Sequence, residues 1–278
     1  GACTTFHTGI PVTVNPKPSL PSVNISGPTS FCQGSSVELS VATTSGYTYQ
    51  WENNGSGITG ATTNSYFAQN PGVFSLKISN SSGCSIRTEN VTVNVLTAPS
   101  PPSISVSGVQ TFCQGDSVVL SVTQTTGNNY QWKLNGGAVG TNSGRYTAKN
   151  SGSYNVVVAN SSGCSASSTN TVAVTANPLP VVGALSQLGD TKFCSGKSVT
   201  LSGPFTAGYS YLWKKGTATI PEAIANSYIA TSSGEYALEV SASSGCKVIT
   251  DPVKVEVLEM PDKPSIDHGG YSKGMCLG

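Results

Sequence analysis

Residues 31–51 read FCQGSSVELSVATTSGYTYQW, and this stretch decides the fold. A cysteine is followed by a glycine, by apolar residues at every second position and, after a polar turn, by a second alternating run that ends at Trp51. Alternation with a period of two is typical of strands that bury one face. The stretch therefore predicts two strands that are separated by a turn, with Trp51 on the buried side.

The same stretch recurs at residues 112–132 and 193–213. The cysteines that open the copies, together with the cysteine of Met275-Cys276-Leu277-Gly278, are 81, 81 and 82 residues apart. A second marker, Ser-Gly-Cys, closes each copy at Cys84, Cys164 and Cys246, and Gly1-Ala2-Cys3 has a similar form. Markers that recur in phase indicate tandem structural repeats.

Proline-rich stretches separate the repeats, as expected of short linkers that cannot donate to a β-ladder. We expect the chain to be an excerpt of a longer array. The predicted segments are 1–18, the last strand of a preceding repeat; 19–97, 98–178 and 179–259, three immunoglobulin-like repeats; and 260–278, the first strand of a following repeat.

Composition places the chain in an oxidising, extracellular setting. Charged residues make up 10% of the sequence, and the 14 basic and 13 acidic residues are scattered along it. Because the chain has no basic stripe, nucleic acid is excluded as a partner. Because it has no long apolar run, membrane insertion is not expected in this fragment. The eight cysteines contain no Cys-x-x-Cys pair, which favours disulfides over zinc.

The alternating runs number about seven in each repeat, and no helix of useful length is predicted. Strands that short and that closely spaced are typical of an all-β class of antiparallel sandwiches. We therefore predict tandem immunoglobulin-like β-sandwich domains in an elongated rod. The expected core residues are Trp51, Trp132, Trp213, Phe74, Tyr154 and Tyr236.

The residues needed for catalysis are scarce. His7 and His268 are the only histidines, so no repeat carries the usual general base. The aspartates do not cluster in a calcium-loop pattern, and the glycine runs lack the lysine and serine or threonine of a phosphate-binding loop. The sequence predicts no enzymatic activity, no catalytic residue, no metal site and no cofactor.

A resemblance to known families rests on these motifs. The Gly-x-Ser-Val-x-Leu run, the tryptophan twelve residues after its leucine, and the Gly-x-Tyr/Phe run resemble strands B, C and F of the immunoglobulin fold. The core disulfide of that fold is absent, since Leu76, Val156 and Leu238 stand where its second cysteine would be. The complete unit resembles the repeats of large cell-surface adhesins of gliding Bacteroidota, the SprB-type proteins. This resemblance implies a secreted protein that is attached to the outer membrane and takes part in gliding motility and cell adhesion.

Two disulfide schemes are open. The intra-repeat scheme joins Cys32 to Cys84, Cys113 to Cys164 and Cys194 to Cys246. The first and second cysteine of a repeat, however, are expected at opposite ends of the sandwich, about 23 Å apart, whereas a disulfide spans about 4.4 to 6.8 Å between Cα atoms. Geometry therefore favours the inter-repeat scheme, which joins Cys32 to Cys164 and Cys113 to Cys246.

The favoured hypothesis is a non-enzymatic structural region, the stalk of a large secreted cell-surface adhesin, whose immediate partners are the neighbouring repeats of the same chain. The alternative is an immunoglobulin-like module that binds a surface polysaccharide or a protein. A third hypothesis is a spacer in a secreted multidomain hydrolase.

Overall fold

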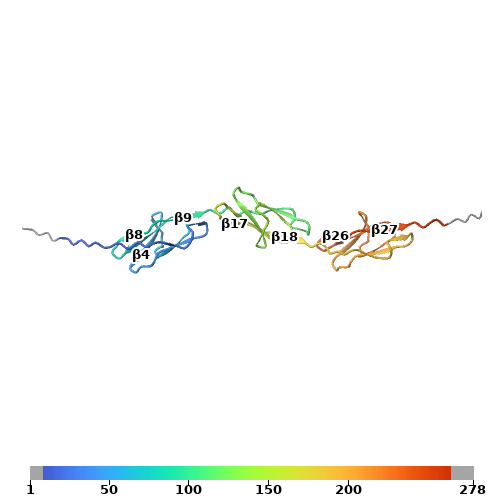
Figure 1. Ribbon diagram of the computed structural model, residues 1–278, viewed down its shortest axis with the longest axis horizontal. Helices are drawn as coiled ribbons and strands as arrows, with labels where there is room; N and C mark the ends of the chain where they lie inside the picture. The colour runs from blue at the N-terminus through green and yellow to red at the C-terminus, as the bar shows by residue number, and fades with distance from the viewer. Residues whose placement is uncertain (1–8, 264–278) are drawn as a thin grey trace, which may run out of the picture. The chain divides into compact units, whose positions relative to one another are not determined.

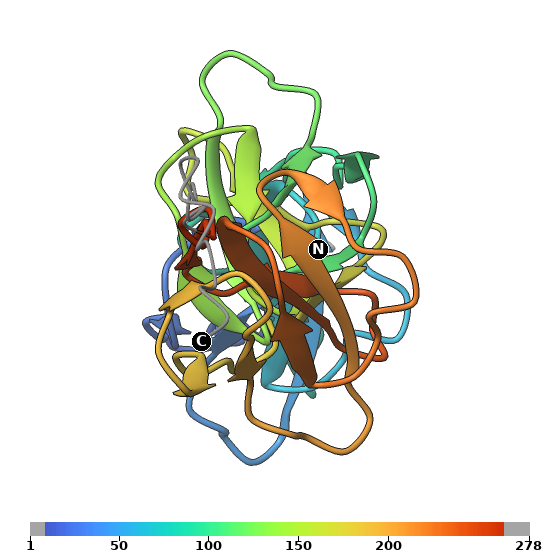
Figure 2. The same ribbon diagram turned by 90° about the vertical axis from the view of Figure 1, so that its right-hand side faces the viewer.

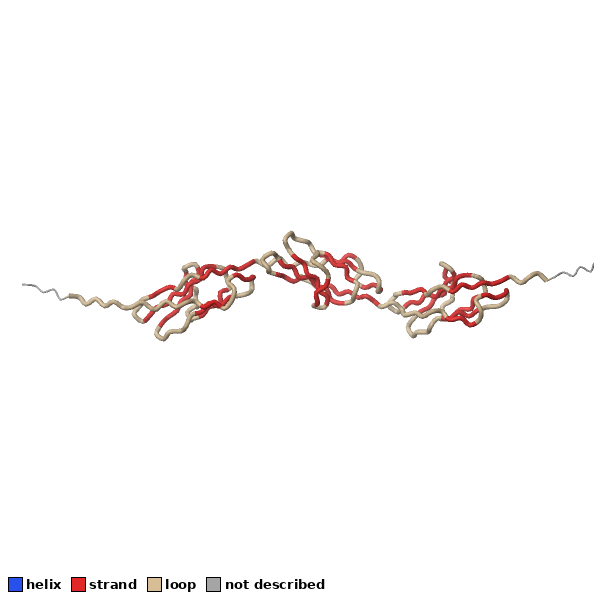
Figure 3. The backbone as a smooth tube through the Cα atoms, in the orientation of Figure 1, coloured by secondary structure: helices blue, strands red, loops and turns tan. Residues whose placement is uncertain are grey.

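The computed structural model describes residues 9–263, and this part of the chain consists of strands and loops without a helix (Figure 3). The all-β prediction is confirmed. Each of the three repeats contains nine strands in the same order, with the same long strand at its seventh position. The period of about 81 residues in the sequence is therefore a period in the structure.

The strands of the first repeat are β1 (Asn24–Ile25), β2 (Ser30–Cys32), β3 (Val37–Ser40), β4 (Tyr47–Asn53), β5 (Ser56–Gly57), β6 (Ser65–Ala68), β7 (Gly72–Asn80), β8 (Ser85–Arg87) and β9 (Val91–Leu96). Those of the second are β10 (Ser105–Ser107), β11 (Thr111–Cys113), β12 (Val118–Ser121), β13 (Asn129–Leu134), β14 (Gly137–Val139), β15 (Arg145–Ala148), β16 (Gly152–Ala159), β17 (Ser165–Ser167) and β18 (Val172–Asn177). Those of the third are β19 (Ser186–Leu188), β20 (Lys192–Cys194), β21 (Val199–Ser202), β22 (Ser210–Lys215), β23 (Ala218–Thr219), β24 (Ser227–Ala230), β25 (Gly234–Ser241), β26 (Lys247–Ile249) and β27 (Val253–Leu258).

Every repeat is a two-layered sandwich. In the first repeat a three-stranded sheet of order β1-β3-β6 faces a six-stranded sheet of order β2-β9-β7-β4-β5, to which β8 adds beside β7. The second and third repeats have the same two sheets with the same orders. Strands of all three repeats are labelled in Figure 1, and Figure 2 shows the same ribbon turned by 90°.

One strand pair in each repeat departs from the antiparallel prediction. The second strand and the last strand run parallel, with Cys32 beside Leu96, Cys113 beside Asn177 and Cys194 beside Leu258. In each pair, both strands donate backbone hydrogen bonds of 2.8–3.0 Å to the other strand, for example from Gln33 N to Leu96 O and from Asn94 N to Thr29 O. The chain therefore enters and leaves a sandwich along two adjacent strands that point the same way.

A tryptophan occupies the centre of each core. Trp51, Trp132 and Trp213 have no exposed surface, and Phe74, Tyr154 and Tyr236 are buried beside them. Each indole nitrogen donates to a backbone carbonyl in the segment before the sixth strand of its repeat, at 2.9–3.1 Å. A buried donor is thereby satisfied, which removes the cost that an unpaired indole N–H would carry.

Apolar packing takes the place of the core disulfide of immunoglobulin domains. Leu76, Val156 and Leu238 have no exposed surface, and each is the cross-strand partner of the tryptophan of its repeat. Full burial of a leucine contributes roughly 1.5–3 kcal/mol. The sandwiches are therefore closed without an internal covalent bond, and their cysteines remain available for another role.

The chain divides into two compact units, and the division passes through the middle repeat. One unit contains residues 1–105, 120–146 and 153–172, and the other contains 106–119, 147–152 and 173–278. The joint between the first and second repeats lies inside the first unit, and the joint between the second and third lies inside the second unit.

The described parts of the two segments predicted as strands of neighbouring repeats are assigned to no strand, and the strands themselves stay a prediction. Residues 9–18 and 260–263 are assigned to no strand, because a strand is defined by hydrogen bonds to a partner strand and none is paired with them. The remainder of these two predictions, together with Cys3, His7, His268 and Cys276, falls on residues 1–8 and 264–278, outside the described residues.

Ion pairs lie on the outer face of the six-stranded sheet in two repeats. In the third repeat the carboxylate of Glu239 on β25 accepts hydrogen bonds of 2.8 Å from Lys214 on β22 and Lys247 on β26. The bonds from Lys214 and then Lys247 outweigh desolvation and hold the pKa of Glu239 below its ordinary value. In the first repeat Arg87 lowers the pKa of Glu52 in the same way.

The third repeat is expected to lose stability in acid through Glu239. A carboxyl group with a lowered folded-state pKa stabilises the fold fully above its unfolded pKa of about 4.3, and this contribution is lost as the pH falls through the lowered pKa. Hydrogen exchange of the β22 and β25 amides at neutral and acidic pH measures the effect. Glu239→Gln should reduce its pH dependence.

The middle repeat is the internal control, because Val157 occupies the position of Glu239 there and no carboxylate is present at that place. Acid loss of protection that is equally large in β13 and β16 and survives in Glu239→Gln would contradict the assignment.

Candidate functional site at the repeat joints

The first joint is a disulfide between neighbouring repeats. Cys32 ends β2 in the first repeat, and Cys164 follows the turn between β16 and β17 in the second. Their sulfur atoms are bonded at 2.04 Å, and their Cα atoms are 5.5 Å apart. The Sγ atom of Cys164 also lies 3.9 Å from the carbonyl oxygen of Leu96, the last residue of β9. The bond therefore lies beside the point where the chain leaves the first repeat.

The second joint has the same construction. Cys113 at the end of β11 is bonded to Cys246 after the turn between β25 and β26, with a Cα separation of 5.6 Å. The Sγ atom of Cys246 lies 3.9 Å from the carbonyl oxygen of Asn177 at the end of β18. Of the two pairing schemes that the sequence leaves open, the structure has the inter-repeat scheme at both joints.

A tight turn positions the second cysteine of each pair. In the second repeat, Gly163 N donates to Asn160 O and Asn160 N donates to Cys164 O, which closes the Asn-Ser-Ser-Gly-Cys turn. Gly163 has a φ of 81°, and Gly83 and Gly245 at the same place have 79° and 85°. Glycine adopts this left-handed conformation without the strain that a Cβ would cause. The recurring Ser-Gly-Cys motif is thus a turn that presents a cysteine.

An asparagine amide fastens the first joint a second time. The side chain of Asn160 accepts hydrogen bonds from Cys164 N and Ser162 N, and its Nδ2 atom donates to the carbonyl of Thr97 at 2.8 Å. Ala242 stands at the equivalent position of the third repeat, so the second joint lacks this bond. The sequence shows the recurrence of Asn80 and Asn160 before Ser-Gly-Cys, but this role was not predicted from it.

Two described cysteines are free, and they occupy the same positions as the bonded ones. Cys84 follows the turn between β7 and β8, and its thiol donates to the carbonyl of Asn15 at 3.6 Å. Asn80 Nδ2 donates to Pro16 O at 2.9 Å, as Asn160 does to Thr97. Cys194 ends β20 beside Leu258, as Cys32 ends β2 beside Leu96. Cys84 and Cys194 therefore occupy the same places in their repeats as the cysteines that are bonded at the two joints.

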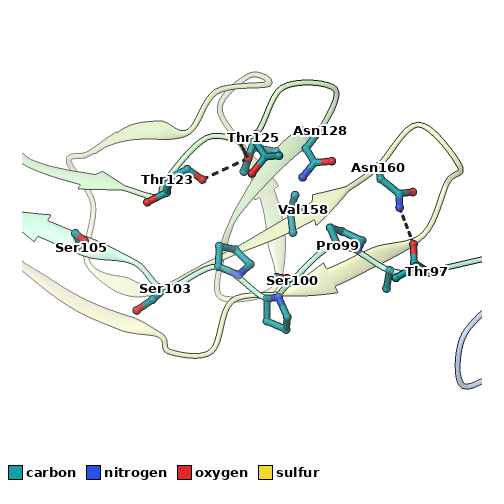
Figure 4. A pocket seen from close by; sticks show the side chains of 14 residues that line it. Thr97, Pro99, Ser100, Ser103, Ser105, Thr123, Thr125, Asn128, Val158 and Asn160 are labelled. Carbon is teal, nitrogen blue, oxygen red and sulfur yellow. Dashed lines mark hydrogen bonds between the residues drawn. The ribbon is translucent and has the colours of Figure 1, made fainter.

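A cavity of about 660 Å³ opens beside the first joint. The linker residues 97–103 form one side of it, and the loop that leads into β13 forms the other, as Figure 4 shows. Its lining contains hydroxyl groups, prolines and two asparagines, and no charged residue. The hydroxyl group of Tyr130 in this wall accepts from Thr125 N and donates to Thr123 O, which fixes the loop.

Residues 9–263 contain no group of three or more histidine, cysteine, aspartate or glutamate side chains that could hold a metal ion. The groups in this range with a resolved pKa shift belong to the ion pairs of Glu52, Glu239 and Glu256. Among the same residues no helix is long and apolar enough to span a membrane.

Comparison with known proteins identifies the kind of domain. Residues 99–178 match the family model described as "Ig-like domain CHU_C associated", and this range lies within the segment 98–178 predicted as one repeat. Together with the repetition of the same two sheets, this match shows tandem immunoglobulin-like domains. No curated protein matches the chain.

Solved structures with immunoglobulin-like folds are similar to the chain at low identity. Three titin domains, I67–I69, in a mutated variant are 13% identical, with coverage of 88% of this chain and 100% of that one and a TM-score of 0.36. A Ca²⁺-stabilised, ice-binding adhesin of an Antarctic bacterium is 15% identical, with coverage of 87% and 74% and a TM-score of 0.33. Fibronectin(III)-like modules of CbhA from Clostridium thermocellum are 16% identical, with coverage of 56% and 95% and a TM-score of 0.31.

Peptide mapping of the oxidised chain should yield two linked peptides, one with Cys32 and Cys164 and one with Cys113 and Cys246. Alkylation before digestion should label Cys84 and Cys194, because both are free and at least partly exposed. A Cys3→Ser, Cys276→Ser background prevents the two terminal cysteines from exchanging with them. Recovery of a peptide that links Cys32 to Cys84 would refute the assignment of the joints.

Proposed function

We propose that the chain is a non-enzymatic stalk region of a large secreted cell-surface protein, and that its parent is an adhesin of the gliding-motility type. The observation that carries the proposal is the covalent bond between successive repeats at both joints. A disulfide that links two domains restricts bending at the linker between them. Restricted linkers suit a spacer that holds a distal region at a distance and transmits tension.

The chemistry of the cysteines supports secretion. Disulfides persist in oxidising environments such as the cell surface and are rare in the cytosol. The sparse charge and the serine- and asparagine-rich surface agree with an extracellular setting. The proposal includes attachment to the outer membrane and a role in gliding because the repeats resemble those of SprB-type proteins.

We also propose that residues 9–18 belong to the last strand of a further repeat. Ile10, Val12 and Val14 are 85–88% exposed and alternate along the chain, as Val91, Val93 and Val95 do in β9. Asn15 and Pro16 hold the contacts to Cys84 and Asn80 that Leu96 and Thr97 hold to Cys164 and Asn160. A neighbouring sandwich would bury these three apolar side chains.

A second candidate function is the binding of a neutral saccharide in the cavity beside the first joint. The observation in its favour is a lining that presents hydroxyl and amide groups beside prolines and contains no charged residue. Neutral sugars are recognised by such groups when they converge in a concave site. The repeats would then serve as binding modules as well as spacers.

Small-angle X-ray scattering tests the stalk. Repeats of about 40 Å give a span of about 120 Å for three in line, and a uniform rod of that length has a radius of gyration of about 35 Å. A compact chain of this length has about 19 Å. We expect the larger value for the oxidised protein. A value near the smaller one would exclude the spacer.

Titration with neutral oligosaccharides tests the second candidate. If the cavity is a binding site, Asn128→Ala should weaken saturable binding because it removes an amide from the wall, whereas Asn24→Ala on the exposed strand β1 of the first repeat should leave binding unchanged. Absence of saturable binding by the unmodified chain, or equal effects of the two substitutions, would reject the cavity as a sugar site.

A further inference from the structure

The cysteines divide each repeat into two parts. In the first repeat Cys32 and Cys84 bracket residues 33–83, in the second Cys113 and Cys164 bracket 114–163, and in the third Cys194 and Cys246 bracket 195–245. Each bracketed segment contains the core tryptophan and strands three to seven of its repeat. The parts outside the brackets are the entering strands, the leaving strands and the linkers.

With both disulfides formed, the parts outside the brackets are joined into two continuous covalent lines. Line X follows residues 19–32, crosses the bond from Cys32 to Cys164, and follows 164–194. Line Y follows residues 84–113, crosses the bond from Cys113 to Cys246, and follows 246–258. Line Y begins at Cys84 and line X ends at Cys194, the two free cysteines of the described chain.

The two lines lie side by side within each repeat. In the second repeat they start together, where Asn160 donates to Thr97 and the sulfur of Cys164 approaches Leu96. Midway, Thr169 N donates to Pro102 O at 2.9 Å. They end together in the parallel pair of β11 and β18, with Cys113 beside Asn177. The lines are therefore adjacent from the first joint to the second.

The parallel pairing decides how tension acts. In a chain without the disulfides, tension enters a repeat at the start of its first strands and leaves at the end of its last strand. The two strands of the parallel pair are then pulled in opposite directions, so the ladder of every repeat carries the full tension in shear. With the disulfides, β18 of the middle repeat belongs to line X and β11 belongs to line Y, and each line is covalently connected to the neighbouring repeats at both joints. Tension can therefore pull the two paired strands in the same direction.

We propose that the inter-repeat disulfides turn the array into a two-stranded covalent cable, in which tension runs along lines X and Y and bypasses the bracketed cores. The proposal deepens the stalk function and rests on it. The partner of Cys84 and the partner of Cys194 are then the corresponding cysteines of further repeats of the same kind, which continue the two lines.

Force spectroscopy along a single line tests the cable. The chain is held at its N-terminus and at Cys194, which both belong to line X, in a Cys3→Ser, Cys84→Ser, Cys276→Ser background that leaves Cys194 as the free thiol for attachment. Line X limits the extension of the oxidised molecule to about 210 Å at about 3.5 Å per residue. After reduction in place, the same molecule should extend to about 670 Å, a roughly threefold increase.

Two matched variants separate the lines. Cys113→Ser with Cys246→Ser removes one disulfide but leaves line X intact, so the limit of about 210 Å should remain. Cys32→Ser with Cys164→Ser also removes one disulfide, cuts line X, and should allow more than twice that extension. Oxidised, unmodified molecules that extend past the limit as readily as reduced ones would overturn the proposal, and so would equal extension of the two variants.

This experiment fails independently of the scattering test. A chain that is compact in solution still has line X and still stops at the same extension when pulled. A rod-shaped chain without the bond from Cys32 to Cys164 extends stepwise through its cores. Force spectroscopy can thus refute the covalent cable while the stalk function stands, and scattering can refute the stalk function while the cable stands.

Discussion

The parallel pairing of the entering and leaving strands of each repeat is the constraint on which the other features depend. It brings Cys32 to the side of Leu96, where the chain passes into the next repeat, and it does the same for Cys113 and Asn177. A cysteine at that place can reach the neighbouring repeat, whereas a cysteine deeper in the strand would face its own sandwich. The joint is thus a consequence of how the sandwich is closed.

Closure by apolar packing frees the cysteines for the joints. Leu76, Val156 and Leu238 pack directly against the core tryptophans, so the interior needs no covalent bond. A bond inside the core constrains one domain, and a bond between domains constrains their linker and closes a loop of more than 130 residues. In the chain-entropy account, the restriction of the unfolded state grows with the length of the closed loop, although slowly. A pair of cysteines at a joint therefore restrains the linker between two domains and also closes a longer loop than a pair inside one core would.

Much of this architecture follows from local sequence patterns, and the rest depends on contacts between distant residues. The period of two around Val37, Leu39 and Trp51 predicts buried strands because side chains alternate along a strand, and those residues are buried in the structure. The length of a strand compared with the span of a disulfide favours the inter-repeat pairing over the intra-repeat one. Neither argument predicts that β2 and β9 pair in parallel, because the pairing depends on which strands meet in the fold and not on the sequence of either strand alone.

The amide of Asn160 shows why the finer parts of the joint escape a reading of the sequence. Asparagine before Ser-Ser-Gly is explained sufficiently by the turn itself, because its side chain accepts the backbone N–H groups of Ser162 and Cys164. Its second role, donation to Thr97, requires a carbonyl from a linker 63 residues earlier in the chain. The third repeat separates the two roles, because with Ala242 the backbone bonds of the turn persist while the bond to the linker is lost. The turn is thus set by the glycine and the backbone, and the asparagine adds a contact to the linker, which Asn80 also makes to Pro16 beside the free Cys84.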